Sequence, residues 1–334
     1  MGDGLGYENQ DEWSREILER RRRRRAEDRR RRRMYMRRRL VAIGALFALV
    51  LVPVLLLNSG GKPKQEIANR EAASATTLPA ADGEGAAGAD NTGTAPDTIP
   101  TKAPEMVTGF DSPVPILMYH VIAEAPVGAA NPGLFVPPEE LEEQVRWLAK
   151  KGYTAVTLSD LFDAWFDGGE IPSKPVVLSF DDGTSDQHDV AARILAAAGW
   201  PGVLNLKVLS LNQHEMSDEM IEDMLSDGWE LASHTRTHPD LAGLDAATLQ
   251  EEVAGSRKAL QRRFDVPVDF FCYPSGSYDA ATIDAVKAAG YRGATTTVEG
   301  LATPDSSPYE LSRIRVNPGD GASGLAAELA AAGA

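Results

Sequence analysis

The C-terminal two thirds of the chain alternates short apolar runs with helix-like stretches, and this alternation constrains the fold more than any other feature. It continues from about Asp111 to Ala334, over about 220 residues. Successive strand-then-helix units build a parallel sheet, because the crossover helix returns the chain to the start of the next strand. Seven or eight such units in this length predict an incomplete barrel, with its chemistry at the C-terminal ends of the strands.

The expected strands are apolar runs bounded by turn residues. They are Pro115–Tyr119, Thr154–Thr157, Pro175–Phe180, Val203–Leu206, Glu230–Ser233, Asp269–Tyr273, Gly293–Thr296 and Ile314–Val316. The expected helices are Pro138–Lys151, Ser159–Phe166, Asp189–Ala198, Ser217–Asp227, Ala246–Phe264 and Ala280–Ala289. Asp245 and Asp279 suit helix N-caps, and Gly199 and Gly290 suit the position just after a helix.

A different composition precedes this domain. Residues 1–39 carry 15 Arg or Lys and 8 Asp or Glu, a net charge of +7 (15 − 8). They are followed by an 18-residue run without a charge, Leu40–Leu57, which is the low end of what crosses a bilayer. By the positive-inside rule, we expect a cytoplasmic tail (1–39), a transmembrane helix (40–57) and an extracytoplasmic remainder. A cleaved signal peptide is the alternative, although its n-region would be unusually long.

Residues 58–110 have the composition of a flexible linker, since 30 of these 53 residues are Ala, Gly, Pro or Thr. The folded domain is then expected over residues 111–334. Residues 40–334 carry 19 basic and 41 acidic residues, a net charge of −22 (19 − 41). This balance argues against nucleic acid as the main partner, because a phosphate backbone requires a basic surface. The arginine runs of residues 1–39 could bind anionic lipid or nucleic acid, but a topological role is the simpler interpretation.

Two polar motifs follow expected strands. His234 and His238 lie four residues apart, and in one helical turn they would share a face and could bind one metal ion. The alternative is a pair of hydrogen-bonded loop histidines. Asp181 and Asp182 are adjacent carboxylates at a strand end, where a cation could stabilise one while the other acts as a base. The alternative is a turn, since Asp and Gly favour turns.

Taken together, the two motifs supply two histidines and one aspartate as ligands and leave positions open for water and substrate. A zinc ion there would lower the pKa of water and polarise a carbonyl oxygen. The only cysteine, Cys272, excludes an intramolecular disulfide and every cysteine-cluster zinc site. It lies in an apolar run and is expected to be a small buried side chain.

Phe180–Gly183 (FDDG) and His234–His238 (HTRTH) resemble the first two motifs of the polysaccharide deacetylases, the NodB-homology group of carbohydrate esterase family 4. The resemblance covers about Pro113–Val316 and implies a distorted (β/α)7 barrel. It implies metal-dependent hydrolysis of N-acetyl or O-acetyl groups on cell-wall or extracellular sugars. In that family's terms, Asp181 would be the general base. Asp182, His234 and His238 would hold the metal, for which zinc is expected and cobalt or manganese are alternatives.

Phe271–Gly276 resembles the third motif of the family, which implies that the backbone N–H of Ser275 helps hold the oxyanion. The chain departs from the family pattern twice. Cys272 stands where the family has an arginine, and the last motif, Leu-x-His, reads Leu311–Arg313 here. Both departures occur in the poly-N-acetylglucosamine deacetylase branch, whose opening Met-Tyr-His segment resembles Met118–His120.

That branch implies His120 as the general acid, and a structural histidine is the alternative. Arg313 is expected in the last strand, where it could pair with Asp181, keep it ionised and replace the missing arginine. An exposed arginine is the other interpretation. The expected protein is therefore a membrane-anchored N-deacetylase whose partners are an N-acetylated polysaccharide and the membrane, with no nucleic acid. The alternatives are an inactive deacetylase-like glycan-binding scaffold, a sugar O-acetyl esterase, or a function centred on a cytoplasmic partner of the tail.

Overall fold

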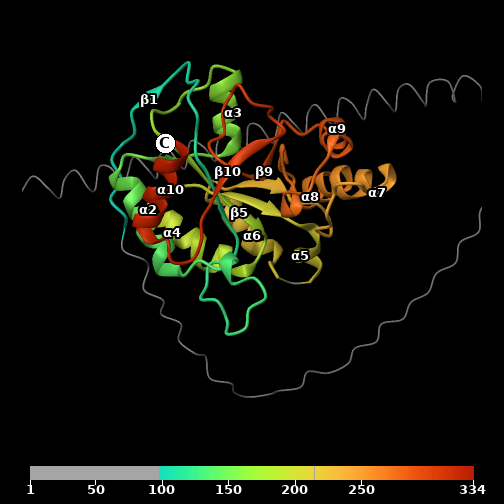
Figure 1. The fold of residues 1–334 in the computed structure, drawn as a ribbon, viewed down its shortest axis with the longest axis horizontal. Coiled ribbons are helices and arrows are strands. Elements are labelled where there is room, and N and C mark those ends of the chain that lie inside the picture. Colours follow the sequence, from blue (N-terminus) through green and yellow to red (C-terminus); the bar gives the residue numbers. More distant parts are fainter. Residues whose placement is uncertain (1–97, 214) are drawn as a thin grey trace, which may run out of the picture. The chain divides into compact units, whose positions relative to one another are not determined.

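The structure is a computed structural model that describes residues 98–213 and 215–334. In this part of the chain, seven parallel strands close into a barrel (Figure 1). The strand β2 (Ile116–Tyr119) pairs with both β10 (Leu311–Arg315) and β5 (Pro175–Asp182), which closes the ring. The other four strands, from β5 round to β10, are β6 (Val203–Leu206), β7 (Glu230–Ser233), β8 (Phe270–Cys272) and β9 (Gly293–Glu299). The predicted parallel barrel is confirmed.

Two short pairings lie outside the ring. The strand β3 (Thr154–Ala155) pairs in parallel with the first two residues of β5. The strands β1 (Met106–Val107) and β4 (Ile171–Pro172), which the sequence did not predict, form a two-stranded antiparallel sheet. All eight predicted strands are present, because parallel strands buried on both faces read as continuous apolar runs.

The helices α2 (Pro138–Lys150), α3 (Leu158–Phe166), α6 (Asp218–Ser226) and α9 (Ala280–Ala288) lie where the sequence predicted them. Two of the predicted helices contain a π-helical segment. One consists of η2 (Gln187–Ala192) and α4 (Arg193–Ala197). The other consists of α7 (Ala246–Gln250), η3 (Glu251–Gly255) and α8 (Ser256–Phe264). The helices α5 (Val208–Asn212) and α10 (Gly321–Ala332) and the 3-10 turns η1 (Pro132–Leu134) and η4 (Pro274–Gly276) were not predicted.

The predicted caps are confirmed. The Asp245 carboxylate accepts from the N–H groups of Ala247 and Thr248 at the start of α7. Asp279 accepts from the N–H of Thr282 at the start of α9. Gly199 and Gly290 adopt φ values of 70° and 82° just after their helices, in the region where a side chain would be strained.

Two apolar layers hold the barrel together. Ile116, Val177, Val203, Ala232, Phe270 and Leu311, from six strands of the ring, meet in one cluster with α3. A cluster that draws from all around a closed sheet lies in its interior. Neighbouring strand residues such as Leu117, Leu178 and Ile314 belong to a second cluster with α2, α4 and α8. Because side chains alternate along a strand, this second cluster lies between the barrel and its outer helices.

The packed unit begins before the expected domain boundary at Asp111. Ile99 is buried, its N–H donates to the carbonyl of Ala197, and β1 pairs with β4. The expected tail (1–39), transmembrane helix (40–57) and most of the expected linker (58–110) lie outside the described residues. Within residues 98–213 and 215–334, the structure contains no helix with the length and apolar character needed to cross a membrane.

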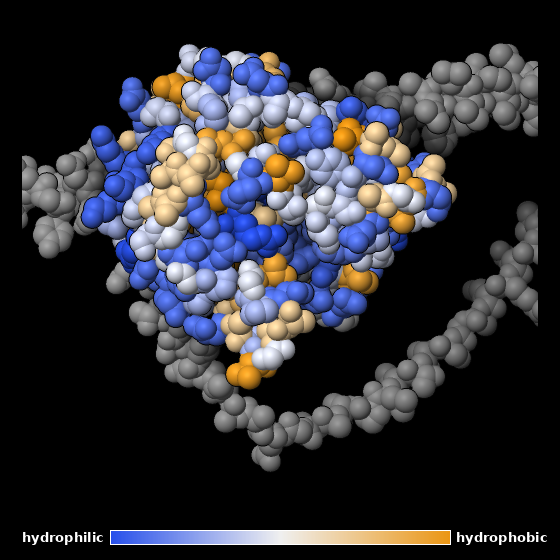
Figure 2. All heavy atoms as spheres, viewed as in Figure 1, coloured by the Kyte–Doolittle hydropathy of each residue, from blue (hydrophilic) through white to orange (hydrophobic). Residues whose placement is uncertain are grey.

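The surface of the described part is mainly hydrophilic in the view of Figure 2, with apolar residues in small separate groups. Large apolar side chains that are well exposed are few among the described residues: Met106, Val127, Phe166 and Val298. Scattered residues of this kind are normal on a folded domain.

Candidate active site

The same alternation that builds the inner apolar layer places polar side chains above it. Asp181 follows Val177 and Ser179 on one face of β5, and Asn205 follows Val203 on β6. Cys272 follows Phe270 on β8, and Arg313 follows Leu311 on β10. Residues two apart on a strand face the same side, so these four polar side chains form the next layer of the barrel interior, toward the C-terminal ends of the strands.

Arg313 and Asp181 form a buried two-point ion pair. The Arg313 Nη1 and Nη2 atoms each lie 2.8 Å from an Asp181 carboxylate oxygen. The arginine side chain is 0% exposed and the aspartate 2%. Arg313 also donates from Nε to the Thr296 carbonyl and from Nη1 to the Ser179 hydroxyl. Arg313 is therefore not the exposed arginine of the alternative interpretation.

This pairing keeps the carboxyl group ionised. Burial alone raises the pKa of Asp181, but the charge and hydrogen bonds of Arg313 outweigh burial, with smaller contributions from His120 and His234. The pKa of Asp181 therefore lies well below its usual range. The Asn205 side-chain N–H donates to the same carboxylate at 2.7 Å, so three donor nitrogens hold it.

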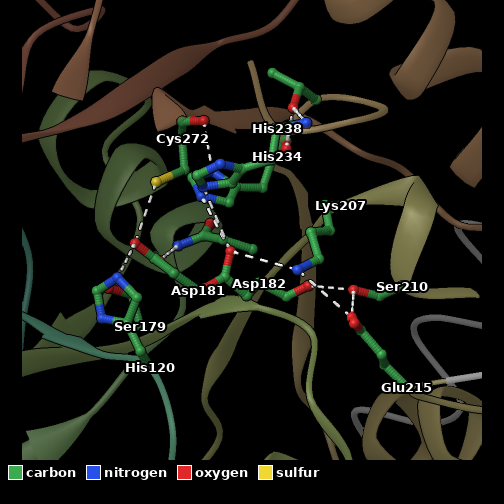
Figure 3. Close-up of polar contacts among 12 residues, drawn as sticks. His120, Ser179, Asp181, Asp182, Lys207, Ser210, Glu215, His234, His238 and Cys272 are labelled. Carbon is green, nitrogen blue, oxygen red and sulfur yellow. Dashed lines mark hydrogen bonds and ion pairs between the residues drawn. The ribbon is translucent and has the colours of Figure 1, made fainter. Parts of the chain in front are cut away.

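Asp182 lies with the two motif histidines. Its Oδ1 atom is 3.4 Å from the Nε2 atom of His238 and 3.9 Å from the Nε2 atom of His234 (Figure 3). Strict alternation would point Asp182 away from Asp181, but Asp182 adopts a φ of 79°, which redirects the chain at the strand end. One carboxylate oxygen and two imidazole nitrogens thus converge, and the three ligand atoms lie within 4.8 Å of one another.

His234–His238 does not form the helical turn that would place both histidines on one face. This segment is an irregular loop, because Thr235 and His238 adopt φ values of 67° and 65°, outside the right-handed helical region. The Thr235 hydroxyl accepts a hydrogen bond from the N–H of His238, which closes the loop. The two imidazole rings nevertheless meet, with centroids 4.8 Å apart, so the loop brings the two histidines together as a helical turn would.

The donor set of this cluster fits a divalent cation. The His234 Nδ1 atom lies 2.8 Å from the carbonyl oxygen of Cys272, which only accepts, so Nδ1 carries the proton. The lone pair of Nε2 then faces Asp182. A histidine fixed in this way by a backbone carbonyl is the usual arrangement of a metal ligand. Burial and the neighbouring His234 lower the pKa of His238, against the opposing effect of Asp182, and this favours the neutral, ligating form.

A second group, Asp181, His234 and Cys272, also brings ligand atoms within 4.8 Å of one another. It fits a cation poorly. Arg313 already neutralises Asp181, and burial raises the pKa of the Cys272 thiol well above its ordinary value. Cys272 is fully buried, as expected, with its Sγ 3.7 Å from an Asp181 oxygen.

Glu252 in η3 holds the histidine loop from outside the cluster. Its carboxylate accepts hydrogen bonds from the N–H groups of Arg236 and Thr237 at 2.8 and 3.0 Å, and from the Thr237 hydroxyl at 2.7 Å. The sequence did not single out Glu252, because a Glu251–Glu252 pair in a helical pattern resembles a solvated face. Its 7% exposure shows the opposite.

His120 and Ser275, the two remaining candidates, lie at the same rim. The His120 Nε2 atom is 3.7 Å from an Asp181 oxygen, and its ring is 14% exposed (Figure 3). Burial lowers the pKa of His120, against the opposing charges of Asp181 and Asp182. Gln187 donates to the carbonyls of both His120 and Asp181, which fixes the two strand ends relative to each other.

Ser275 adopts a φ of 54° in η4, directly after β8. Within the described residues its backbone N–H has no hydrogen-bond partner, so it is free to bind a ligand atom. Of the five non-glycine residues with positive φ in the described chain, Asp182, Thr235, His238 and Ser275 lie in the three motif segments. Such strained positions cluster at sites whose geometry is imposed by the surrounding fold.

Comparison with known proteins agrees with this geometry. Residues 168–294 match the sequence profile of the polysaccharide deacetylase family. YxkH of Bacillus subtilis (strain 168), whose name places it among the polysaccharide deacetylases, is 31% identical over 217 residues, covering 65% of this chain and 76% of that protein. The poly-beta-1,6-N-acetyl-D-glucosamine N-deacetylase of Staphylococcus aureus (strain MRSA252) is 24% identical over 197 residues, covering 54% of this chain and 68% of that protein.

Among solved structures, the Streptococcus pyogenes deacetylase PplD, in complex with acetate, superposes with a TM-score of 0.61 at 26% identity. The superposition covers 66% of this chain and 99% of that one. The barrel, the converging motifs and these relatives agree, and the chain belongs to the polysaccharide deacetylase family.

Proposed function

We propose that this protein removes N-acetyl groups from N-acetylglucosamine-containing polysaccharide of the cell wall or extracellular matrix and releases acetate. The observation that carries the proposal is the juxtaposition of two carboxylates with different partners. Asp181 is held ionised by Arg313, and the adjacent Asp182 faces two histidine nitrogens. The names of the relatives support the same chemistry, since one of them is a poly-beta-1,6-N-acetyl-D-glucosamine N-deacetylase.

Asp182, His234 and His238 would hold a divalent metal, and zinc suits a site with two imidazoles and one carboxylate. When bound, the metal supplies Lewis acidity that activates water and polarises the acetamide carbonyl. Three protein ligands are typical of catalytic zinc sites, since they leave room for water and substrate.

The remaining residues move protons and hold charge. Asp181 acts as general base and takes a proton from the attacking water, for which it must be ionised. The Ser275 N–H donates to the oxyanion that forms on the acetamide carbon. His120 donates a proton to the leaving sugar amine, so that the C–N bond breaks and acetate is released with a free amine on the sugar. The distance of 3.7 Å between His120 Nε2 and an Asp181 oxygen supports this pairing of acid and base at one acetamide group.

Arg313 takes the place of the arginine that the third motif lacks at Cys272. It acts through Asp181 and does not face substrate, because it is 0% exposed. It is thus a positioning residue that keeps the base charged. His120 takes over the general-acid role of the missing Leu-x-His histidine. It follows the last residue of β2, whereas the missing histidine would lie in β10.

We also propose that the enzyme works outside the cytoplasmic membrane, anchored by residues 40–57 and held off the bilayer by a linker that begins at residue 58. The charge-free run and its arginine-rich flank support this topology. An envelope polysaccharide is the substrate that such a tethered enzyme would meet.

Acetate release by the full-length protein tests the proposal, with N-acetylglucosamine oligomers and whole peptidoglycan as substrates. We expect release that a chelator abolishes, that zinc restores and that Asp181→Asn removes. Asp284→Asn, the same change on the exposed side of α9, should leave release unchanged. A folded, metal-loaded protein that releases acetate only from O-acetylated sugars would replace the N-deacetylase with an esterase. No release from any of these substrates would contradict the proposal.

A further inference from the structure

Lys207 lies beside the candidate metal ligands, where its charge opposes that of a cation. It follows the last residue of β6, so the strand that supplies Asn205 to the inner layer brings Lys207 to the rim. The Lys207 Nζ atom is 4.0 Å from Asp182 Oδ1, the same oxygen that faces the Nε2 atoms of His234 and His238 (Figure 3). At 4.0 Å the ammonium makes no hydrogen bond to Asp182, and the interaction is one of charge alone.

A second carboxylate holds the ammonium in place. Glu215 Oε2 lies 3.5 Å from Lys207 Nζ and 2.7 Å from the Ser210 hydroxyl. Ser210, in α5, also lies 2.8 Å from the carbonyl oxygen of Asp182. Lys207 is 18% exposed, so it is partly shielded from water, and its position is fixed by groups on both sides.

From this arrangement we infer that Lys207 weakens the binding of the metal at Asp182, His234 and His238, and that Glu215 partly offsets this effect. Like charges repel, and a unit charge a few ångströms from a divalent cation changes its affinity by about tenfold or more even at the dielectric constant of water. Before the metal binds, the same ammonium offsets the negative charge of Asp182. The Lys207–Glu215 pair thus sets how readily the site gains and loses its metal.

The inference rests on the metal site of the proposed function and is tested without turnover. The dissociation constant for zinc is measured on the full-length protein in detergent, by competition with a chromophoric chelator. Lys207→Met keeps the length and apolar stem of the side chain and removes its charge. We expect it to bind zinc about tenfold more tightly than the wild type. Glu215→Gln leaves the ammonium without its counter-charge and should bind zinc several-fold more weakly.

Lys150→Met is the matched control. Lys150 ends α2, and the C-terminus of a helix in such a barrel lies at the opposite end from the site. Its zinc affinity should equal that of the wild type. A Lys207→Met protein with unchanged or weaker affinity would overturn the inference and leave the proposed function intact. Wild-type protein that binds no zinc would overturn the metal assignment itself.

Discussion

Replacing Arg313 with methionine removes the cation from a pair that is shut away from water. The Asp181 carboxylate would keep the Asn205 N–H, the Cys272 thiol at 3.7 Å and His120 at 3.7 Å as partners, and none of these is a permanent charge. Breaking a buried pair by removing one partner leaves an uncompensated charge and typically costs about 3–5 kcal/mol of stability. The Arg263–Asp218 pair, which is 41% and 44% exposed, provides the contrast. Arg263→Met should cost only about 0–1 kcal/mol.

The cost should depend on pH in a defined direction. In the wild type the folded pKa of Asp181 lies below the unfolded value of about 3.9, so its stabilising contribution is present above that value and is lost as pH falls through the folded pKa. Without Arg313, only the weaker effects of His120, His234 and the Asn205 N–H oppose burial, and we expect burial to raise the folded pKa of Asp181 above about 3.9. The contribution of the variant is then present at low pH and lost as pH rises. The two proteins should therefore differ least near pH 4 and most near pH 7.

Urea denaturation of the metal-free proteins between pH 4 and pH 8 measures this difference. The same shift predicts a new acidic limb in the pH profile of kcat/KM for Arg313→Met, because its base is protonated over part of the range. In the double variant Arg313→Met/Asp181→Asn no charge is left unpaired, so it should recover part of the lost stability. A stability difference that does not vary with pH, together with a kcat/KM profile that gains no acidic limb, would refute the reasoning.

Two further predictions concern the supports of the site. Glu252→Gln should lower zinc affinity about 10–100-fold, because the amide cannot accept all three hydrogen bonds that fix the histidine loop. Glu222→Gln, the same change on the exposed side of α6, is the control in the same chelator competition, and equal losses in the two variants would contradict a specific role. His120→Gln should lower kcat about 10²–10⁴-fold in acetate release while zinc affinity is kept. Loss of metal binding instead would make His120 a ligand or a structural residue.

The barrel could be predicted because its strands are apolar runs between turn residues, a pattern that survives in a single sequence. Alternation along the last strand suggested that Arg313 could pair with Asp181 but left an exposed arginine open, and the contacts of Arg313 decide between the two interpretations. The helix α10 escaped prediction because it is rich in alanine and has only Leu325 and Leu329 as buried anchors, which gives no clear apolar stripe. Asn205 could have been found by the same alternation, since it follows Val203 on β6.

The histidine loop shows why other features of the site could not be predicted from the sequence. Two histidines four residues apart are compatible with a helical turn, and no residue type in His234–His238 predicts the positive φ of Thr235. In the sequence, Glu252 and Lys207 look like ordinary charged surface residues. The tertiary contacts show that Glu252 is buried and that Lys207 lies beside Asp182. Their roles depend on long-range proximity, which residue patterns do not encode.

The two π-helical segments, η2 and η3, have a consequence for how this chain tolerates insertions and deletions. Each carries the residue that braces the site: Gln187 in η2 spans two strand ends, and Glu252 in η3 spans the histidine loop. A π turn holds one residue more than an α turn, and such bulges are frequent at functional sites. Deleting a single residue from either segment would give a smoother helix. It would also rotate the bracing side chain by about 100° relative to the apolar face of the helix. Whether the site is assembled would then depend on which way that side chain points, and not on the stability of the helix.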